Sequence, residues 1–255
     1  MDKYWIWFSR INKIGAKTQN MLLEKYKTPE KIWNLRKNEL AKILTEEQLK
    51  IISCKKYREN LELYEKYMKN NNIQMITIND NDYPEKLKNI YDKPVVLYAL
   101  GNIKCLNNAS LAVIGSRMCS EYGMYIANRF SYNISKHNIN IVSGLAKGID
   151  SYAHIGAIKA GKPTVAVIGC GLDKIYPKEN YEIYRKIIKA GGVIVSEYIV
   201  GTKPEKINFP ARNRIISGLS DAILVVEAAR KEWFTNNSRF CFRTGENDLC
   251  YPTEI

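Results

Sequence analysis

Histidine and paired cysteines are scarce in this sequence, which argues against metal and disulfide chemistry. The 255 residues include two histidines and six cysteines, and no two cysteines form a Cys-x-x-Cys pair. Structural zinc sites and secreted disulfide frameworks usually show such pairs or closely spaced histidines. We therefore expect no metal site, and we expect a reduced, cytoplasmic protein.

Long hydrophobic runs are also missing. No stretch approaches the roughly 18 apolar residues that identify a membrane-spanning helix. The apolar run within residues 1–10, MDKYWIWFSR, is too short for a secretory signal peptide. The sequence therefore predicts no membrane span.

Two nucleotide-binding fingerprints are absent. The chain has no Gly-x-Gly-x-x-Gly string after a predicted strand and no Gly-x-x-x-x-Gly-Lys-Ser/Thr string. These absences argue against a nicotinamide or flavin enzyme and against ATP hydrolysis. We expect no cofactor.

Acidic residues are few relative to basic ones. Lysine and arginine total 39 against 26 aspartates and glutamates, which gives a net charge of +13 at pH 7. Such an excess favours a polyanionic partner, most simply nucleic acid. The alternative explanation is a lysine-rich solvated surface encoded by an AT-rich genome.

Residues 1–70 predict a small helical domain. Apolar residues recur there at helical spacing, and two helix starts are marked by Thr28-Pro29 and by Thr45 with Gln48. Residues 11–17, INKIGAK, resemble the hairpin of a helix–hairpin–helix DNA-backbone module. Only Gly15 stands where such hairpins often have two glycines, so we favour a plain helical bundle.

After residue 70 the sequence pattern predicts alternating strands and helices. Short apolar strands without simple polar alternation indicate a parallel sheet that is covered by helices on both faces, an α/β fold. The expected strands are 73–78, 94–100, 111–114, 139–142, 164–168, 193–196 and 223–226. The expected helices are 84–90, 121–136, 180–190 and one that opens at Asp150.

Small and basic residues gather where the predicted strands end. In parallel α/β sheets, ligands bind outside the carboxyl ends of the strands. Arginine forks suit phosphate, and an aromatic ring offers a stacking face for a base. We predict a groove there that binds the phosphates of a ligand, although each residue also has an ordinary structural explanation. The contributing residues are Gly115, Ser116, Arg117, Ser143, Gly144, Lys147, Gly148, Phe209, Arg212 and Arg214.

The segment 141–154, IVSGLAKGIDSYAH, shows the pattern most clearly. A strand that turns through small residues into a helix leaves backbone N–H groups unpaired, which predicts an anion site beside Lys147. The alternative is an ordinary strand–loop–helix joint. Asp150 and His154 could share a helix face as an acid/base pair, but no nucleophile or metal set accompanies them. We therefore interpret Asp150 as a helix cap and His154 as a packed or hydrogen-bonded residue.

Together these motifs resemble the DNA-processing protein A family, also called Smf. The resemblance is carried by VIGSR (113–117), SGLAKGIDSYAH (143–154), VIGCGLDKIYP (167–177), SEY (196–198), FPARNRIISGLSD (209–221) and VVEA (225–228). The upstream segment 77–102 also matches. The resemblance covers about residues 75–231.

The resemblance implies an extended Rossmann-like fold, with no known enzymatic activity. It implies that the protein binds single-stranded DNA and loads the RecA recombinase during natural transformation. It also implies that DNA is contacted by the turn 115–117, the loop 143–148 and the segment 209–214, which includes Asn213. Family members pair as homodimers. Part of the pairing surface falls in residues after Lys231, where this chain departs from the family, so the oligomeric state stays open.

The tail departs from the family after Lys231. The family would continue with a string like SGSLITADFAxxxGKxVYAIPG, whereas this chain continues with EWFTNNSRFCFR. Codons for the observed residues can encode much of the family string when they are read one base later. We hypothesise a one-base insertion near codon 231 or 232, which leaves residues 71–231 as a truncated DNA-binding domain and 232–255 as an out-of-frame tail. The tail should then be loosely packed, the strand at 223–226 should lack its normal neighbour, and binding should be impaired or lost.

Two other kinds of function stay open. One is a nucleotide-processing enzyme, such as the phosphoribohydrolases on a related Rossmann-like sheet, although their PGGxGT-type loop with a following glutamate is not found here. The other is a duplex-backbone binder that acts through the helices of residues 1–70.

Overall fold

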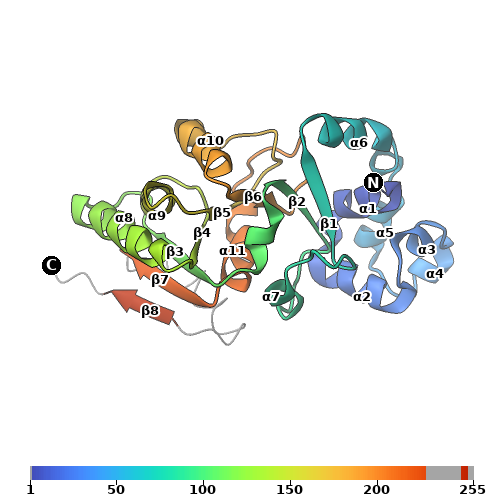
Figure 1. The fold of residues 1–255 in the computed structure, drawn as a ribbon. Helices are drawn as coiled ribbons and strands as arrows, with labels where there is room; N and C mark the ends of the chain where they lie inside the picture. The colour runs from blue at the N-terminus through green and yellow to red at the C-terminus, as the bar shows by residue number, and fades with distance from the viewer. Residues whose placement is uncertain (1, 228–247, 252–255) are drawn as a thin grey trace.

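The structure joins an N-terminal group of short helices to a long twisted sheet (Figure 1). It is a computed structural model, and it describes residues 2–227 and 248–251 of the chain. Side chains are described only up to Glu227.

The N-terminal segment is helical, as its apolar spacing predicts. Thr28 accepts a hydrogen bond from the amide of Lys31, and Thr45 forms a capping box with Gln48, so both predicted helix starts are confirmed. The elements are α1 (Lys3–Arg10), η1 (Asn12–Ile14), α2 (Ala16–Tyr26), α3 (Pro29–Trp33), α4 (Lys37–Leu40), α5 (Glu46–Ile52), η2 (Lys55–Tyr57) and α6 (Leu61–Asn70).

This helical segment shares its hydrophobic core with the sheet. Trp7 and Phe8 of α1 are fully buried, and their cluster continues to Tyr98 and Ile194 on the strands. Ser9 and Tyr98 share a buried hydrogen bond of 2.5 Å between their hydroxyl oxygens. The helices therefore pack directly against the sheet edge.

Eight strands form one sheet within the described residues, in the order β1-β2-β6-β5-β4-β3-β7-β8. The strands are β1 (Ile73–Thr77), β2 (Val96–Gly101), β3 (Ser110–Gly115), β4 (Asn140–Ser143), β5 (Thr164–Ile168), β6 (Val193–Ser196), β7 (Ala222–Val226) and β8 (Asp248–Tyr251).

The sheet is mixed, whereas the sequence predicts a parallel one. In the spatial order of the sheet, the six strands β6-β5-β4-β3-β7-β8 are parallel to one another. β2 pairs antiparallel with β6, and β1 pairs antiparallel with β2. The chain between β1 and β2 includes the short helix α7 (Glu85–Lys88), and it returns beside β1 in the opposite direction. These two strands extend the sheet toward the N-terminal helices.

Helices cover both faces of the sheet, as predicted (Figure 1). Residues of α8, α9 and α10 pack on one face, and residues of α11 and α7 pack on the other. The helices are α7 (Glu85–Lys88), α8 (Glu121–Lys136), α9 (Ile149–Lys159), α10 (Tyr181–Lys189) and α11 (Asn208–Gly218), with two short turns, η3 (Ile103–Asn107) and η4 (Lys178–Asn180).

The outer edge of β7 is paired, which corrects one expectation. The out-of-frame hypothesis expects the strand at 223–226 to lack its normal neighbour and to leave its edge uncovered, but β8 pairs with it in parallel from Ile223↔Asp248 to Val226↔Tyr251. A parallel partner satisfies the backbone groups that an edge strand would otherwise expose. The expectation of a loosely packed tail over residues 232–247 and 252–255 lies outside the described residues.

In the part of the chain that the structure describes, no helix is both long and apolar enough to cross a membrane.

Candidate nucleic-acid interface

The carboxyl ends of five parallel strands, β3 to β7, lie at one edge of the sheet. We call the segments that follow them the strand-end rim: 115–117, 143–148, 169–177, 196–202 and the first turn of α11. The predicted loops therefore come together, because strands that run parallel deliver their ends to one edge.

The turn after β3 is built around Gly115 and Ser116. Gly115 pairs with Val226, and a Cβ atom there would collide with the carbonyl oxygen of Val226. The amide of Ser116 donates to the carbonyl of Glu227 at 2.8 Å. This anchoring leaves Arg117 exposed at the crest of the turn.

The loop 143–148 is held against β3 and the turn that follows β3. The hydroxyl of Ser143 is buried and donates to the carbonyl of Val113 at 2.7 Å, so this side chain has a structural role. Gly148 has φ +74°, and a Cβ atom there would press against the carbonyls of Ser116 and Arg117. Glycine is therefore required where the two loops touch.

Asp150 is not the cap of α9, which corrects the sequence interpretation. The N-cap residue is Gly148, and Asp150 lies in the first helical turn. Its Oδ2 accepts hydrogen bonds from the amides of Gly144 at 3.2 Å and Ala146 at 3.3 Å. The carboxylate thus occupies amides that the sequence assigned to a bound anion, because a side chain two residues into the helix reaches back over the loop.

Arg212 lies beneath this loop rather than on the surface. Its side chain is buried, with the residue 4% exposed, and Nη1 donates to the carbonyls of Gly144, at 2.7 Å, and Val167. Burial lowers the pKa of Arg212 to about 10, against the opposing charge of Asp150. Burial also raises the pKa of Asp150, which Arg212 acts to lower. The hydrogen bonds of Arg212 tie α11 to the ends of β4 and β5, and Asp150 is a nearby buried charge of opposite sign.

His154 is packed and hydrogen-bonded, as predicted. It is fully buried, and its Nδ1 lies 2.9 Å from the hydroxyl of Thr164. Burial lowers its pKa to about 3, so the imidazole is neutral at physiological pH. His154 does not reach the surface of the rim, which gives no geometric support to an acid/base pair with Asp150.

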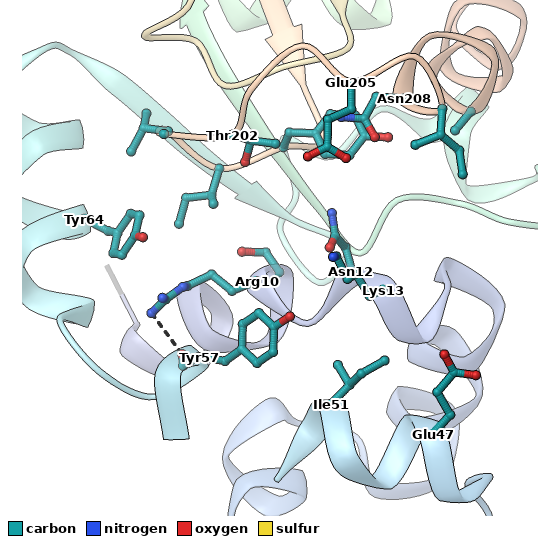
Figure 2. A pocket seen from close by; sticks show the side chains of 17 residues that line it. Arg10, Asn12, Lys13, Glu47, Ile51, Tyr57, Tyr64, Thr202, Glu205 and Asn208 are labelled. Atoms are coloured by element: carbon teal, nitrogen blue, oxygen red, sulfur yellow. Dashed lines mark hydrogen bonds between the residues drawn. The ribbon is translucent and has the colours of Figure 1, made fainter. Parts of the chain in front are cut away.

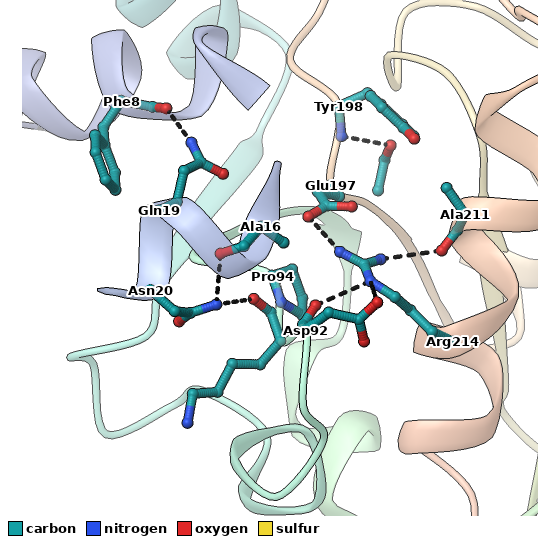
Figure 3. Close-up of polar contacts among 12 residues, drawn as sticks. Phe8, Ala16, Gln19, Asn20, Asp92, Pro94, Glu197, Tyr198, Ala211 and Arg214 are labelled. Atoms are coloured by element: carbon teal, nitrogen blue, oxygen red, sulfur yellow. Dashed lines mark hydrogen bonds and ion pairs between the residues drawn. The ribbon is translucent and has the colours of Figure 1, made fainter. Parts of the chain in front are cut away.

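Arg214 is also buried, in a polar network that joins α11 to Asp92 and Glu197 (Figure 3). Its guanidinium donates to Glu197 at 2.6 Å and to the carbonyls of Asp92 and Ala211. Burial acts to lower the pKa of Arg214, but the charges of Glu197 and Asp92 overcome this effect and raise it. Asn213, between the two arginines, is half-buried. The charge of Arg214 is therefore neutralised inside the protein.

An aromatic platform stands on the rim, and part of it was missed by the sequence analysis. The ring of Phe209 lies 5.3 Å from the ring of Tyr176, and the guanidinium of Arg117 lies 5.7 Å from the Phe209 centroid. Tyr176 is 46% exposed. Its position in the segment after β5, two residues beyond Lys174, is the signal that could have identified it. We call Arg117, Phe209 and Tyr176 the aromatic platform.

Lys147 is exposed and already has a partner. Its Nζ lies 2.5 Å from Oε1 of Glu179, and this contact lowers the pKa of that carboxylate. Since both side chains are solvent-exposed, the pair is weak and easily exchanged. Lys147 is thus available to a phosphate that competes with Glu179.

Over the described residues, no group of three or more histidine, cysteine or acidic side chains is arranged to hold a metal ion. The described cysteines, Cys54, Cys105, Cys119 and Cys170, are free thiols.

Comparison with protein-family models gives a match to one described as DNA recombination-mediator protein A, over residues 74–255. The match starts at β1 and continues past Lys231, further along the chain than the motifs alone indicate.

Curated relatives share substantial identity with this chain. Protein Smf of Synechocystis sp. is 36% identical over 234 residues, which is 89% of this chain and 58% of that protein. DNA processing protein DprA of Streptococcus pneumoniae is 45% identical over 179 residues, which is 70% of this chain and 63% of that protein. The chain thus spans less than two thirds of the length of either relative.

Two solved structures are similar to this one. The X-ray structure of DNA processing protein A from Streptococcus pneumoniae has a TM-score of 0.79 and 30% identity, and the match covers 100% of this chain and 88% of that one. DNA processing protein A from Helicobacter pylori, described for its single-stranded DNA binding mode, has a TM-score of 0.65 and 29% identity over 71% of this chain and 82% of that one. The expected Rossmann-like fold is confirmed.

Proposed function

The chain belongs to the DNA recombination-mediator protein A family, and on this premise we propose that it binds single-stranded DNA at the strand-end rim and acts in DNA recombination. The single observation that carries this proposal is the aromatic platform. It combines a stacking surface with an exposed cation, which is the combination that sequence-tolerant single-strand binding requires.

The platform suits unpaired bases rather than a duplex. Bases in a duplex are stacked on each other, whereas a single strand presents its faces to aromatic rings. Tyr176 and Phe209 offer two rings that are tilted by 38° to each other. Arg117, beside Phe209, can meet the phosphate that joins two stacked bases.

The residues of the predicted site then divide by position. In this proposal Arg117, Lys147 and Phe209 contact DNA, and Gly115, Ser116 and Gly148 shape the turns that carry the two basic side chains. Arg212 and Arg214 act from below, because their burial and internal hydrogen bonds hold the shape of the rim. Ser143 and Gly144 belong to the same support, and Asn213 lies between it and the surface.

Fluorescence anisotropy of a labelled oligo(dT) tests the proposal. We expect salt-sensitive binding that weakens in Arg117→Ala and in Lys147→Ala. Lys159→Ala is the matched control, because Lys159 is an exposed lysine at the other end of α9 from the loop 143–148. An unlabelled duplex competitor should displace the oligonucleotide poorly. Equal losses in all three variants, or efficient displacement by the duplex, would contradict a single-strand site on the rim.

Glu179 provides a test with the opposite sign. If Lys147 exchanges this carboxylate for a phosphate, Glu179→Gln removes the competitor and one negative charge. Binding of oligo(dT) should therefore tighten in Glu179→Gln, most clearly at low salt. Unchanged affinity would mean that Lys147 is not a DNA ligand.

Several finer points belong to the same proposal. We infer loading of RecA onto the bound strand during natural transformation, pairing of two copies, and a cytoplasmic location, which are supported by the family resemblance. We also retain the hypothesis that residues 232–255 are out of frame. The nucleotide sequence tests it directly, since codons that cannot encode SGSLITA one base later would refute it.

A further inference from the structure

A cavity lies between the N-terminal helices and the loop that follows β6 (Figure 2). Its volume is about 760 Å³. Pockets that hold small ligands commonly measure ~300–1,000 Å³. The proposed rim contacts involve neither this cavity nor the hairpin-like segment 11–17, whose residues Asn12 and Lys13 line it.

Aromatic rings form one wall of the cavity. Tyr57 of η2 and Tyr64 of α6 both line it. Arg10 fixes this wall, because its guanidinium donates to the carbonyls of Lys56, Tyr57 and Glu59 at 2.7–3.0 Å and lies 4.6 Å from the Tyr64 centroid. Arg10 therefore holds the backbone around Tyr57 and the ring of Tyr64 before any ligand arrives.

Polar side chains enter from both sides. Figure 2 shows Asn12 and Lys13 of η1 directed across the cavity toward Glu205 and Asn208. Amide side chains offer both a donor and an acceptor, as the edge of a nucleobase requires. Carboxylates accept hydrogen bonds from exocyclic amino groups of bases.

The charges in the cavity favour a neutral occupant. Lys13 faces the same space as Glu205, and Glu47 lies at its border. Arg10 has its N–H groups directed to backbone carbonyls. A phosphate would meet these carboxylates in the cavity, whereas an uncharged base would not be repelled.

The cavity continues the strand-end rim. Asn208 lines the cavity and its neighbour Phe209 belongs to the aromatic platform, so the first turn of α11 separates the two places. The loop from Tyr198 to Thr202 also lines the cavity, directly after the end of β6. A strand that crosses the rim from β3 toward β6 would next arrive at this opening.

We propose that this cavity receives a nucleobase of the single strand that lies on the rim, stacked against Tyr57 or Tyr64 and held at its edge by Asn12 and Asn208. The proposal rests on the proposed function and extends its path to the N-terminal helices. It gives the segment 11–17 a role in holding an unpaired base.

Photocrosslinking distinguishes the cavity from the rim in one experiment. The full chain is irradiated with an oligo(dT) in which 5-iododeoxyuridine replaces thymidine, and the modified residues are mapped by mass spectrometry. We expect adducts at Tyr57 or Tyr64 together with adducts at Phe209 or Tyr176. Rim adducts without cavity adducts would overturn this inference and leave the proposed function standing. An absence of adducts at both places would overturn both.

Affinity gives an independent measure. A lost stacking partner should weaken oligo(dT) binding about fivefold or more, so Tyr57→Leu and Asn12→Ala should both bind more weakly than the native chain. Tyr125→Leu is the matched control, because Tyr125 is 52% exposed on α8 and away from the cavity lining. Circular dichroism checks that each variant is folded. If Tyr57→Leu fails to fold, Asn12→Ala carries the comparison, and native affinity in it would overturn the inference.

Discussion

Replacement of Arg212 by methionine tests the claim that this arginine supports the rim from below. Methionine has a similar length but removes the charge and the hydrogen bonds to the carbonyls of Gly144 and Val167. It also leaves Asp150, which is 7% exposed, without its buried counter-charge. The loop 143–148 loses the connection that ties it to α11.

The expected loss of stability is large. Loss of these hydrogen bonds from a charged donor, together with a nearby counter-charge, should cost about 3–5 kcal/mol, because the carboxylate of Asp150 then stays buried without compensation. A protein domain has a total unfolding free energy of only about 5–15 kcal/mol. At roughly 2–4 °C per kcal/mol for a chain of this size, the melting temperature of Arg212→Met should fall by roughly 6–20 °C.

The loss should depend on pH, with a sign that follows from Asp150. Burial raises the pKa of this carboxyl, and Arg212 acts to lower it. Without Arg212 the folded-state pKa rises further above the unfolded value of about 3.9, so the folded protein binds the proton more readily than the unfolded chain. Stability then falls as pH rises between these two values. The penalty of Arg212→Met should therefore be greatest at neutral pH and smaller in mild acid.

Urea and thermal unfolding followed by circular dichroism measure both effects. Arg185→Met is the control, because the Arg185 side chain is 65% exposed and its ion pair with Glu182 spans 3.9 Å. An exposed pair contributes only ~0–1 kcal/mol. The reasoning would be refuted if Arg212→Met were as mild as this control, or if its penalty were the same at neutral and acidic pH.

Three further substitutions test other contacts. Burial lowers the pKa of His154 to about 3, whereas the unfolded chain has a value of about 6.5, so the folded protein loses stability as pH falls from about 6.5 toward 3. His154→Leu should flatten this part of the stability–pH curve, as measured by urea titrations. Gly148→Ala places a Cβ atom against the carbonyl of Ser116 at a φ of +74°, so it should cost more than ~1 kcal/mol in urea unfolding and also weaken oligo(dT) binding. Gly123→Ala brings a Cβ atom to 2.6 Å from the Glu227 carboxyl carbon, and thermal melts should show a loss of about 1–3 kcal/mol, whereas native stability would mean that this carboxylate moves freely.

Local sequence patterns predict most of the elements. The expected helix 121–136 and the strands 164–168 and 193–196 agree with α8, β5 and β6 residue for residue. These elements have a clear apolar run or a capping residue such as Ser120, whose side chain accepts from the Gly123 amide. Such signals act over a few neighbouring residues, so they can be recognised without the fold.

Burial of the arginines could not be predicted in this way. Arg214 is held by Asp92, which lies 122 positions away along the chain, and Arg212 meets Gly144 across 68 positions. Two arginines that closely follow Pro210 suggest an exposed segment unless these distant partners are known. The antiparallel direction of β1 and β2 depends in the same way on long-range pairing with β6.

The role of Asp150 shows a third limit. Its sequence position fits a helix start, but its carboxylate accepts from amides that precede the helix. The anion site that the sequence places in this loop is thus partly occupied by the protein's own side chain. In the proposed complex, the contacts to DNA therefore move outward, to Lys147 and the aromatic platform.

The most direct test of the central claim is the salt dependence of oligo(dT) binding in the double variant Arg117→Ala/Lys147→Ala. Each phosphate contact to a single strand contributes roughly 0.7 to the slope of log K against log salt concentration. The account predicts weaker binding and a slope that is shallower than that of the native chain by roughly 1.4. A slope equal to the native one would contradict it, because the strand would then be held by cations elsewhere on the molecule.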